Sequence, residues 1–441
     1  MTSRVKNKIA VIGGGVSGIA TAHYLLEEGY KVDLYEANSR LGGRMSLSNM
    51  GDREICFGGK NIGRQYSEFR KFIELHIVPA YEYFGINSAR IVRGKIKPFN
   101  SQNKFQAIRN LVEAASISDI LKLLRAVNAV KADRRNGDLC GPYFQNLKIE
   151  KYSSIEQYFS PKLSKSIIRS LTVRMNGAEP GQVSLENFGT HLQLLQDEFD
   201  QLQNPLSSLF EQFENHSDLN VYLNHEVESL KKSKRGFHLT TNGKTEIYQN
   251  IVLSLPANIS SQLIGESFPE IALCLNQVRY FPVGVVIAEY ENPVFDQEVR
   301  ALTFGENLPL SNVGAYGIDD LNLARFTFSG KAAQEVLHPD IRGEELLAMG
   351  EAIAKPYLNI SDNTLKSFGA KYWTTGLCGY STQEENFQLR LEQVVEGCHG
   401  LFLTGDYLKG ASLENCFRSA MSVVNKIVKQ RSNRSELNVF A

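Results

Sequence analysis

Residues 8–44 constrain the fold most strongly, because a buried strand, a glycine loop, a helix and a second strand follow one another there. Residues 8–12 are an apolar run, as expected of a strand buried on both faces. Gly13, Gly15 and Gly18 then give the spacing G-x-G-x-x-G. We expect a helix over 19–28, ended by Gly29, and a strand over 32–35 that leads to an acid, Glu36. This order is typical of a dinucleotide-binding unit.

Each residue type in this segment has a chemical reason. Gly13 permits the tight turn, Gly15 lets a pyrophosphate approach the backbone, and Gly18 lets the helix pack closely on the sheet. The start of the helix offers free N–H groups and the positive end of the helix dipole to phosphates. Glu36 follows at the distance where a carboxylate accepts hydrogen bonds from a ribose diol. The alternative, a glycine turn without a ligand, is disfavoured by this context.

A second glycine pair distinguishes between cofactors. Residues 39–44 read S-R-L-G-G-R, which resembles the R-x-G-G-R segment of the FAD-dependent family of amine oxidases, protoporphyrinogen oxidases and carotenoid-type desaturases. In that family the glycines let the backbone pass the diphosphate and the second arginine pairs with it. The resemblance implies these roles for Gly42, Gly43 and Arg44. A simple nicotinamide dehydrogenase does not need this segment, so FAD is favoured over NAD.

The same resemblance continues along the chain. Residues 58–63 are similar to the family element that passes under the flavin ring, although a purely structural glycine turn remains the alternative. Near the other end, a strand over 401–404 ends in Gly405 and Asp406, and a glycine loop opens a helix over about 413–429. This resembles the C-terminal FAD motif, in which the helix start stabilises negative charge on the reduced flavin. The step Glu414-Asn415-Cys416 is closer to protoporphyrinogen oxidases than to amine oxidases.

The family pattern also implies an adenine contact at Val227 and a strand returning to the cofactor at Pro256. Cys378 is displaced by one position from the place where some amine oxidases link flavin, so we expect non-covalent FAD. The residues predicted to contact it are Gly13, Gly15, Val16, Ser17, Gly18, Glu36, Ala37, Gly42, Gly43, Arg44, Gly58, Gly59, Lys60, Asn61, Val227, Pro256, Gly405, Asp406, Ser412, Leu413 and Glu414.

The expected fold class is α/β, with a discontinuous Rossmann-like FAD-binding domain and a substrate domain made of a mixed β-sheet and a helical subdomain. The FAD-binding domain is assigned residues 1–85, 214–272 and 391–430. The helical subdomain is assigned 86–213, the substrate sheet 273–390, and a loose tail 431–441. We expect a hairpin over 45–57, strands over 221–257, 277–290, 302–304, 323–329 and 370–373, and helices over 68–84, 105–131, 153–174, 184–213 and 339–354.

Few residues point to the chemistry. The family moves a hydride from a substrate C–H bond to flavin N5, and O2 usually reoxidises the flavin. Amine oxidases carry a lysine on a central substrate strand, whereas residues 280–286 contain none and are more similar to protoporphyrinogen oxidases and desaturases. Trp373 and Tyr380 are candidates for catalytic aromatic residues or for plain cavity wall. Arg174 and Arg325 are candidates for binding a substrate carboxylate, with a surface position as the alternative; Arg325 joins Trp373 and Tyr380 as a catalytic candidate.

The amino-acid composition limits the kinds of binding partner and cellular location that we expect. The chain has 48 Lys+Arg and 48 Asp+Glu, so no net field favours nucleic acid. No apolar run is long enough to span a membrane, and the first strand leaves no room for a signal peptide. The 6 cysteines form no C-x-x-C, which indicates a reduced, cytoplasmic protein. The 8 histidines show no metal-ligand spacing, so no metal is expected. A homodimer remains open.

We therefore expect an FAD-dependent oxidase or dehydrogenase that forms a C=C or C=N bond in a small organic molecule, with O2 as electron acceptor. A protoporphyrinogen-oxidase-like or desaturase-like reaction, including one in specialised metabolism, is favoured. The alternative enzyme is an amine or amino-acid oxidase. A non-enzymatic escort protein of prenylated GTPases shares this architecture, but Glu36, Arg44 and Asp406 argue against it.

Overall fold

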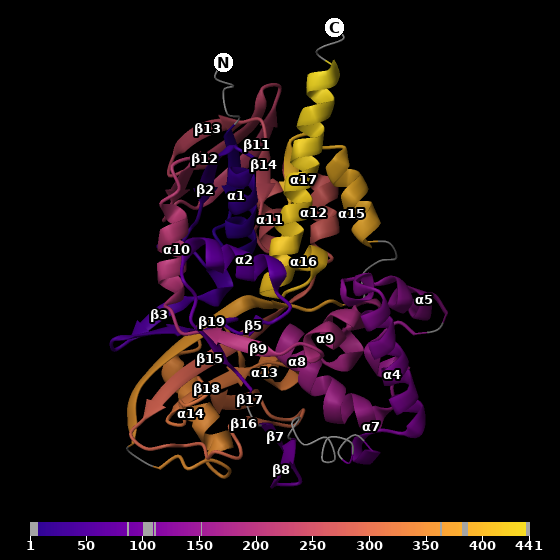
Figure 1. The fold of residues 1–441 in the computed structure, drawn as a ribbon, viewed down its shortest axis with the longest axis vertical. Helices are drawn as coiled ribbons and strands as arrows, with labels where there is room; N and C mark the ends of the chain where they lie inside the picture. The colour runs from indigo at the N-terminus through magenta and orange to yellow at the C-terminus, as the bar shows by residue number, and fades with distance from the viewer. Residues whose placement is uncertain are drawn as a thin grey trace.

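The computed structural model describes residues 8–85, 88–99, 109, 112–150, 152–361, 364–381 and 387–437. The two ends of the chain lie together at one end of an elongated molecule, next to a parallel sheet (Figure 1). A second, larger sheet lies at the opposite end, with a group of helices beside it (Figure 1). The architecture is therefore the expected α/β fold with a mixed substrate sheet.

The parallel sheet is built from distant parts of the sequence. Its order is β10-β2-β1-β14-β20, and all four pairings are parallel. The strands are β1 (Lys8–Ile12), β2 (Lys31–Tyr35), β10 (Leu219–Tyr222), β14 (Ile251–Leu253) and β20 (Leu401–Leu403). Because β2 lies on one side of β1 and β14 on the other, the winding reverses there, and ligands bind at such a switch point, outside the carboxyl ends of the strands.

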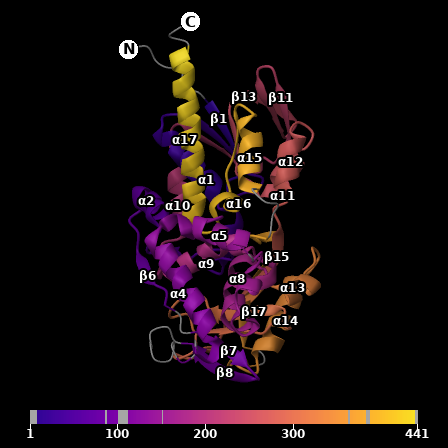
Figure 2. The ribbon, with the colours of Figure 1, turned by 90° about the vertical axis from the view of Figure 1, so that its right-hand side faces the viewer.

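Four helices cover this sheet: α1 (Val16–Glu27), α2 (Ser67–His76), α10 (Leu206–Glu214) and α17 (Leu413–Leu437). α17 runs alongside α1, so the first and last helices of the chain pack together (Figure 2). The rings of Phe69, Phe72 and Phe417 form the centre of this layer.

α17 continues to Leu437, so residues 431–437 are helical rather than loose. The helix predicted over 68–84 was wrong beyond His76, because Pro79 disfavours helical backbone before it.

Smaller elements surround the parallel sheet. The hairpin predicted over 45–57 is β3 (Leu47–Met50) with β4 (Arg53–Cys56). An antiparallel sheet contains β11 (Val227–Ser233), β12 (Gly236–Thr241) and β13 (Lys244–Tyr248), and Asn242 and Gly243 turn with φ of 48° and 69°, as a tight hairpin turn requires. The helices on this side are α11 (Ala257–Ile264), α12 (Pro269–Leu275), α15 (Phe387–Glu396) and α16 (Asp406–Lys409).

The substrate sheet has seven strands in the order β19-β15-β18-β17-β16-β7-β8. They are β7 (Ser88–Val92), β8 (Lys95–Phe99), β15 (Tyr280–Tyr290), β16 (Ala301–Thr303), β17 (Leu310–Ala315), β18 (Leu323–Phe328) and β19 (Leu365–Cys378). The sheet is mixed because β16 and β7 pair in parallel while the other pairs are antiparallel. α13 (Lys331–Val336) and α14 (Gly343–Ala354) pack against it.

The remaining helices form the wall beside this sheet. They are α4 (Ile117–Ala132), α5 (Pro142–Glu150), α6 (Ile155–Tyr158), α7 (Pro161–Leu163), α8 (Arg169–Asn176) and α9 (Phe188–Leu195). Residues 86–213, which were assigned to a helical subdomain, also contain strands that the sequence did not predict. β7 and β8 join the substrate sheet, and β9 (Phe199–Leu202) pairs with β5 (Ile62–Gly63) and β6 (Tyr81–Tyr83). Residues 105–108, where a helix was also expected, lie outside the described residues.

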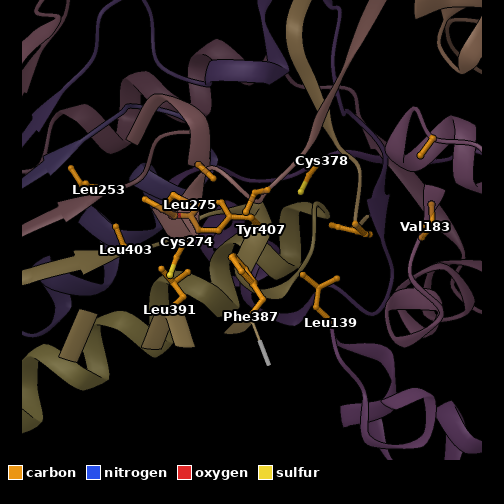
Figure 3. Close-up of a cluster of buried hydrophobic side chains, with 14 of the residues drawn as sticks. Leu139, Val183, Leu253, Cys274, Leu275, Cys378, Phe387, Leu391, Leu403 and Tyr407 are labelled. Atoms are coloured by element: carbon orange, nitrogen blue, oxygen red, sulfur yellow. The ribbon is translucent and has the colours of Figure 1, made fainter. Parts of the chain in front are cut away.

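One hydrophobic cluster joins the two ends of the molecule (Figure 3). Leu253 and Leu403 come from the parallel sheet, Tyr407 from the turn after it, and Cys378 from the end of β19. Because these side chains pack in one core, the substrate sheet is held against the carboxyl ends of the parallel strands. Within the described part of the chain, no helix has the length and apolar character needed to cross a membrane.

Candidate active site

A single cavity of about 1900 Å³ extends from the glycine loop after β1 to the substrate sheet. Ordinary small-molecule pockets hold roughly 300–1,000 Å³, so this cavity has room for a dinucleotide and a second molecule. Gly13, Pro256 and Asp406, which follow β1, β14 and β20, lie on its wall. The cavity thus lies at the switch point of the parallel sheet.

Two glycine loops touch at the nucleotide end of the cavity. The N–H of Gly42 donates to the carbonyl of Gly14 at 2.9 Å, and Gly15 and Gly42 form an isolated parallel bridge. A Cβ on Gly43 would lie 2.9 Å from the Cα of Gly15, so the second loop needs glycine to come this close. A Cβ on Gly15 would meet nothing nearer than 3.9 Å and would fill the space beside the start of α1. This is the kind of cradle that a pyrophosphate needs.

Gly18 lies outside the cavity wall and serves the packing of α1. A Cβ at this position would lie 1.8 Å from the carbonyl oxygen of Gly13 and 2.7 Å from the Oγ of Ser254. Of the predicted cofactor residues, Gly18 therefore acts through helix packing, as the third glycine of such a loop is expected to do.

Glu36 is buried at the end of β2 and lines the cavity. Its Oε2 accepts the N–H of Gly14 at 2.7 Å, and its Oε1 accepts the N–H of Asn38 at 2.8 Å. The Nδ2 of Asn38 also donates to Oε1, at 2.6 Å. A carboxylate has about four acceptor sites, so a site on Oε2 remains for a hydroxyl of a ribose. Ala37 and Val227 lie on the cavity wall as well, as predicted for the adenosine end.

Arg44 and Asp406 join the two predicted FAD segments directly. The Nη1 of Arg44 donates to Oδ2 of Asp406 at 2.7 Å, and the hydroxyl of Tyr280 donates to Oδ1 at 2.8 Å. Burial is the largest influence on the pKa of Arg44 and would lower it, but the charge of Asp406, its hydrogen bond to Arg44 and the nearby Tyr280 together raise that pKa. The sequence did not single out the hydroxyl of Tyr280, because only the fold brings β15 to this loop.

The start of α17 lies on the cavity wall through Ser412 and Leu413, and the Oγ of Ser412 accepts the N–H of Asn415 at 3.1 Å. Two predicted cofactor residues beside it lie outside the wall. The carboxylate of Glu414 accepts the N–H groups of Glu68 and Phe69 and so caps α2. Gly405 is extended and donates to the Oγ of Ser419.

The loop 58–61 lines the middle of the cavity, and Arg325 holds it in place. The guanidinium of Arg325 donates to the carbonyls of Phe57 at 2.6 Å and Gly58 at 3.0 Å. These carbonyls take part of the donor capacity of Arg325, which also lines the cavity, so its contact with a substrate carboxylate stays a prediction. A Cβ on Gly59 would meet nothing within 4 Å, so this glycine faces open cavity.

Lys60 extends from the same loop over the ring of Tyr316. Its Nζ donates to the carbonyl of Tyr316 and, at 3.1 Å, to the Oε1 of Gln201. Burial, and then the nearby charge of Arg325, lower the pKa of Lys60 well below its usual value. The sequence placed Lys60 beside the flavin but contained no signal for Tyr316.

Trp373 and Tyr380 both line the cavity. Within the described part of the chain, only Tyr380 has a hydrogen bond at the polar group of its side chain. Tyr380 has φ of 47°, and its hydroxyl accepts the N–H of Ala411, which ties β19 to the loop before α17. The indole of Trp373 lies on the wall among apolar side chains of the substrate sheet. Trp373 stays a candidate for substrate contact, while Tyr380 acts first as a structural link.

A buried histidine that sequence reasoning missed supports this end of the cavity. His191 of α9 is fully buried, and its Nε2 lies 2.5 Å from the Oδ1 of Asn176. The amide of Asn176 in turn donates to the carbonyl of Cys378 at 2.7 Å. His191 stands in no motif, so no sequence signal could have found it.

We expect stability to fall with acidification because of His191. Burial lowers the pKa of His191 from 6.5 to about 4, so between these values the unfolded chain binds a proton that the folded chain does not. The free energy of unfolding should therefore fall as pH falls from about 6.5 to about 4, by up to roughly 3 kcal/mol from this group. Urea titrations at several pH values measure the effect. His191→Gln should flatten the dependence and the exposed His399→Gln should not; equal slopes in both variants would contradict this.

Comparison with known proteins agrees with this geometry. The family model of the flavin containing amine oxidoreductases matches residues 16–428. The chain belongs to this family. The family consists of flavin-containing oxidoreductases. Among the described residues, no group of three His, Cys, Asp or Glu could hold a metal ion.

Individual relatives are distant. A lysine-specific histone demethylase 1 homolog 2 from Arabidopsis thaliana is 28% identical over 168 residues, 32% of this chain and 22% of that protein. The chain thus matches less than a quarter of the length of this curated relative. An Exiguobacterium sp. 255-15 protein assigned as a protoporphyrinogen oxidase has TM-score 0.71 at 17% identity, covering 97% of this chain and 99% of its own. Putrescine oxidase bound to putrescine has TM-score 0.74 at 16% identity, covering 96% and 99%. These two likenesses show the fold.

Proposed function

We propose that the protein is an oxidoreductase that binds FAD non-covalently and oxidises a C–H bond of a small organic substrate to give a C=C or C=N bond, with O2 as electron acceptor. The observation that carries this proposal is the continuity of the cavity from the glycine loops to the substrate sheet. A nucleotide cofactor at one end and a substrate at the other would meet inside one continuous cavity. We further propose that the protein is cytoplasmic.

The residues present fit FAD. Gly15 and the start of α1 offer a glycine-lined space and free N–H groups for the pyrophosphate, and Glu36 offers acceptors for the ribose. The start of α17 offers a positive dipole end at the other side of the cavity. Burial raises the pKa of the Cys378 thiol well above its usual value, so little thiolate exists to attack a flavin, which supports non-covalent binding.

A flavin bound in this cavity would supply the hydride acceptor. The protein would position the substrate, exclude water from it and hold or accept protons. Val283 and Val285 of β15 and the indole of Trp373 give the substrate end an apolar wall that excludes water. Lys60 is suited to hold or accept a proton at Nζ, because its lowered pKa favours the neutral amine. Arg325 positions the loop that carries Lys60 through the carbonyls of Phe57 and Gly58.

A pair of glycines offers a sharp test. Gly59→Val and Gly305→Val both place side chains where the structure has no atom within 4 Å of the Cβ, and neither glycine has a positive φ. Only Gly59 lines the cavity. We expect both variants to keep the melting temperature of the wild-type protein, while Gly59→Val alone loses most of its bound flavin, measured by absorbance of the purified protein. Equal flavin content in the two variants would contradict the proposed position of the flavin beside the loop 58–61.

A further inference from the structure

The described wall of the cavity at its substrate end carries several cations and no carboxylate. Among the described residues on the cavity wall, the acids are Glu36, Glu226 and Asp406. The first two lie at the nucleotide end, and Asp406 is bonded to Arg44. The cations around the substrate sheet and α8 are Lys60, Arg90, Arg169, Arg174, Arg325 and Lys371.

Most of these cations have identified contacts within the protein. Arg169 forms an ion pair with Glu179 at 2.7 Å, and Arg90 donates to the carbonyl of Ser166. Arg325 donates to the carbonyls of the loop 56–58, and Lys60 donates to the carbonyl of Tyr316. Their charges therefore help to set the potential of the cavity, and each of these four side chains donates to at least one acceptor within the protein.

Arg174 differs from them. It lies in the last turn of α8, which packs against β17 and β19 of the substrate sheet. Its side chain has solvent-accessible surface and lines the cavity, and within the described residues it has no hydrogen-bond or ion-pair partner. Arg174 is exposed and lies on the cavity wall, and burial by the surrounding protein lowers its pKa with no described carboxylate to offset this.

We propose that Arg174 binds a carboxylate of the substrate, so that the enzyme acts on an organic acid rather than on a simple amine. This rests on the proposed function, since it takes the substrate sheet to be the substrate end. A planar guanidinium matches a carboxylate with two parallel hydrogen bonds, and an open fork inside a cavity is available for such a pair. An ammonium substrate would meet Arg174, Arg325 and Lys371 without a described acid to pair with.

The test uses four ligands with the same ring: benzoate, benzamide, benzylamine and phenyl phosphate. Each is titrated into the FAD-loaded protein, and binding is followed by the difference spectrum of the flavin and by the melting temperature. We expect benzoate to bind at least about tenfold tighter than benzamide and benzylamine, because a hydrogen bond to a charged group is worth that much. Phenyl phosphate distinguishes the proposed carboxylate site from a general anion site. A general anion site would bind phenyl phosphate as well as benzoate.

Two variants of Arg174 and one control variant test whether the preference for benzoate depends on Arg174. Arg174→Gln should reduce benzoate affinity about ten- to a hundredfold and remove the preference over benzamide, and Arg174→Lys should keep part of it. Arg125→Gln changes an exposed arginine of α4 outside the cavity wall and should leave benzoate binding unchanged. Benzoate binding that survives Arg174→Gln, a preference for benzylamine, equal or tighter binding of phenyl phosphate, or no response to benzoate would overturn the inference.

Failure of the proposed function would be seen separately. Wild-type protein that holds no FAD would refute the flavin assignment, while the melting temperature of the same protein with benzoate would still test Arg174. Protein that is loaded with FAD but shows no preference for benzoate would refute only the carboxylate site.

Discussion

Gly18→Ala should prevent the protein from folding stably, whereas Gly15→Ala, three residues earlier in the same loop, should leave it folded. The new Cβ at position 18 would lie 1.8 Å from the carbonyl oxygen of Gly13. Because the clashing atom belongs to the backbone, the start of α1 must move away from β1. Overpacking of this kind costs about 3 kcal/mol or more, and thermal unfolding measures it.

Gly15→Ala isolates cofactor binding. A Cβ at this position would meet nothing nearer than 3.9 Å, and Gly15 is the N-cap of α1 with ordinary extended backbone. Replacing glycine by alanine at an N-cap costs about 1 kcal/mol, so the variant should fold. It should nevertheless lose most of its bound FAD, because the methyl group fills the space where a pyrophosphate approaches the backbone.

Flavin content and melting temperature, measured together, decide between the two roles. We expect low stability for Gly18→Ala, and near-normal stability with little flavin for Gly15→Ala. A stable Gly18→Ala protein would contradict the close packing of α1 on the loop. A Gly15→Ala protein with full flavin content would contradict the pyrophosphate position.

Asp406→Leu should also strongly lower the free energy of unfolding. The carboxylate of Asp406 is 3% exposed and accepts hydrogen bonds from Arg44 and Tyr280. Leucine fills the volume but leaves the guanidinium and the hydroxyl without this acceptor, which should lower the free energy of unfolding by about 3 kcal/mol. Urea denaturation gives this value directly.

Further variants distinguish loss of the ion pair between Arg44 and Asp406 from a nonspecific loss of stability. Asp406→Asn keeps an acceptor oxygen and should lose less stability than Asp406→Leu. Combining Arg44→Met with Asp406→Leu should be less destabilising than the sum of the single changes, because the second change removes a group that has already lost its partner. Strict additivity would show that the 2.7 Å contact between Arg44 and Asp406 does not contribute to stability.

Local patterns in the sequence predicted the cofactor half of the fold well. The apolar run of β1, the glycine spacing and the acid at Glu36 act over a few residues, so they can be read without the fold. β17 and β9 were missed for the opposite reason. β17 contains Asn312 and Gly314 and is a strand because its neighbours pair with it on both sides, and β9 is held by pairing with β5 and β6.

Side-chain partners were the least predictable part of the site. The sequence marked Arg325 and Glu414 by type and spacing, but the carbonyls that hold Arg325 lie about 270 residues earlier, in the loop after β4. Glu414 was expected beside the flavin and instead caps α2. His191 and Tyr316 carry no motif at all, and only long-range packing brings them to the cavity.

The central claim is that the two ends of the chain form one cavity that binds FAD without a covalent bond. The most direct measurement is the visible spectrum of the purified native protein, followed by denaturation, filtration and identification of what is released. We expect the absorption bands of an oxidised flavin, at about one flavin per chain, and release of all of it as FAD into the filtrate. Colourless protein that stays colourless after incubation with FAD would contradict the claim, and so would a flavin that remains on the denatured chain.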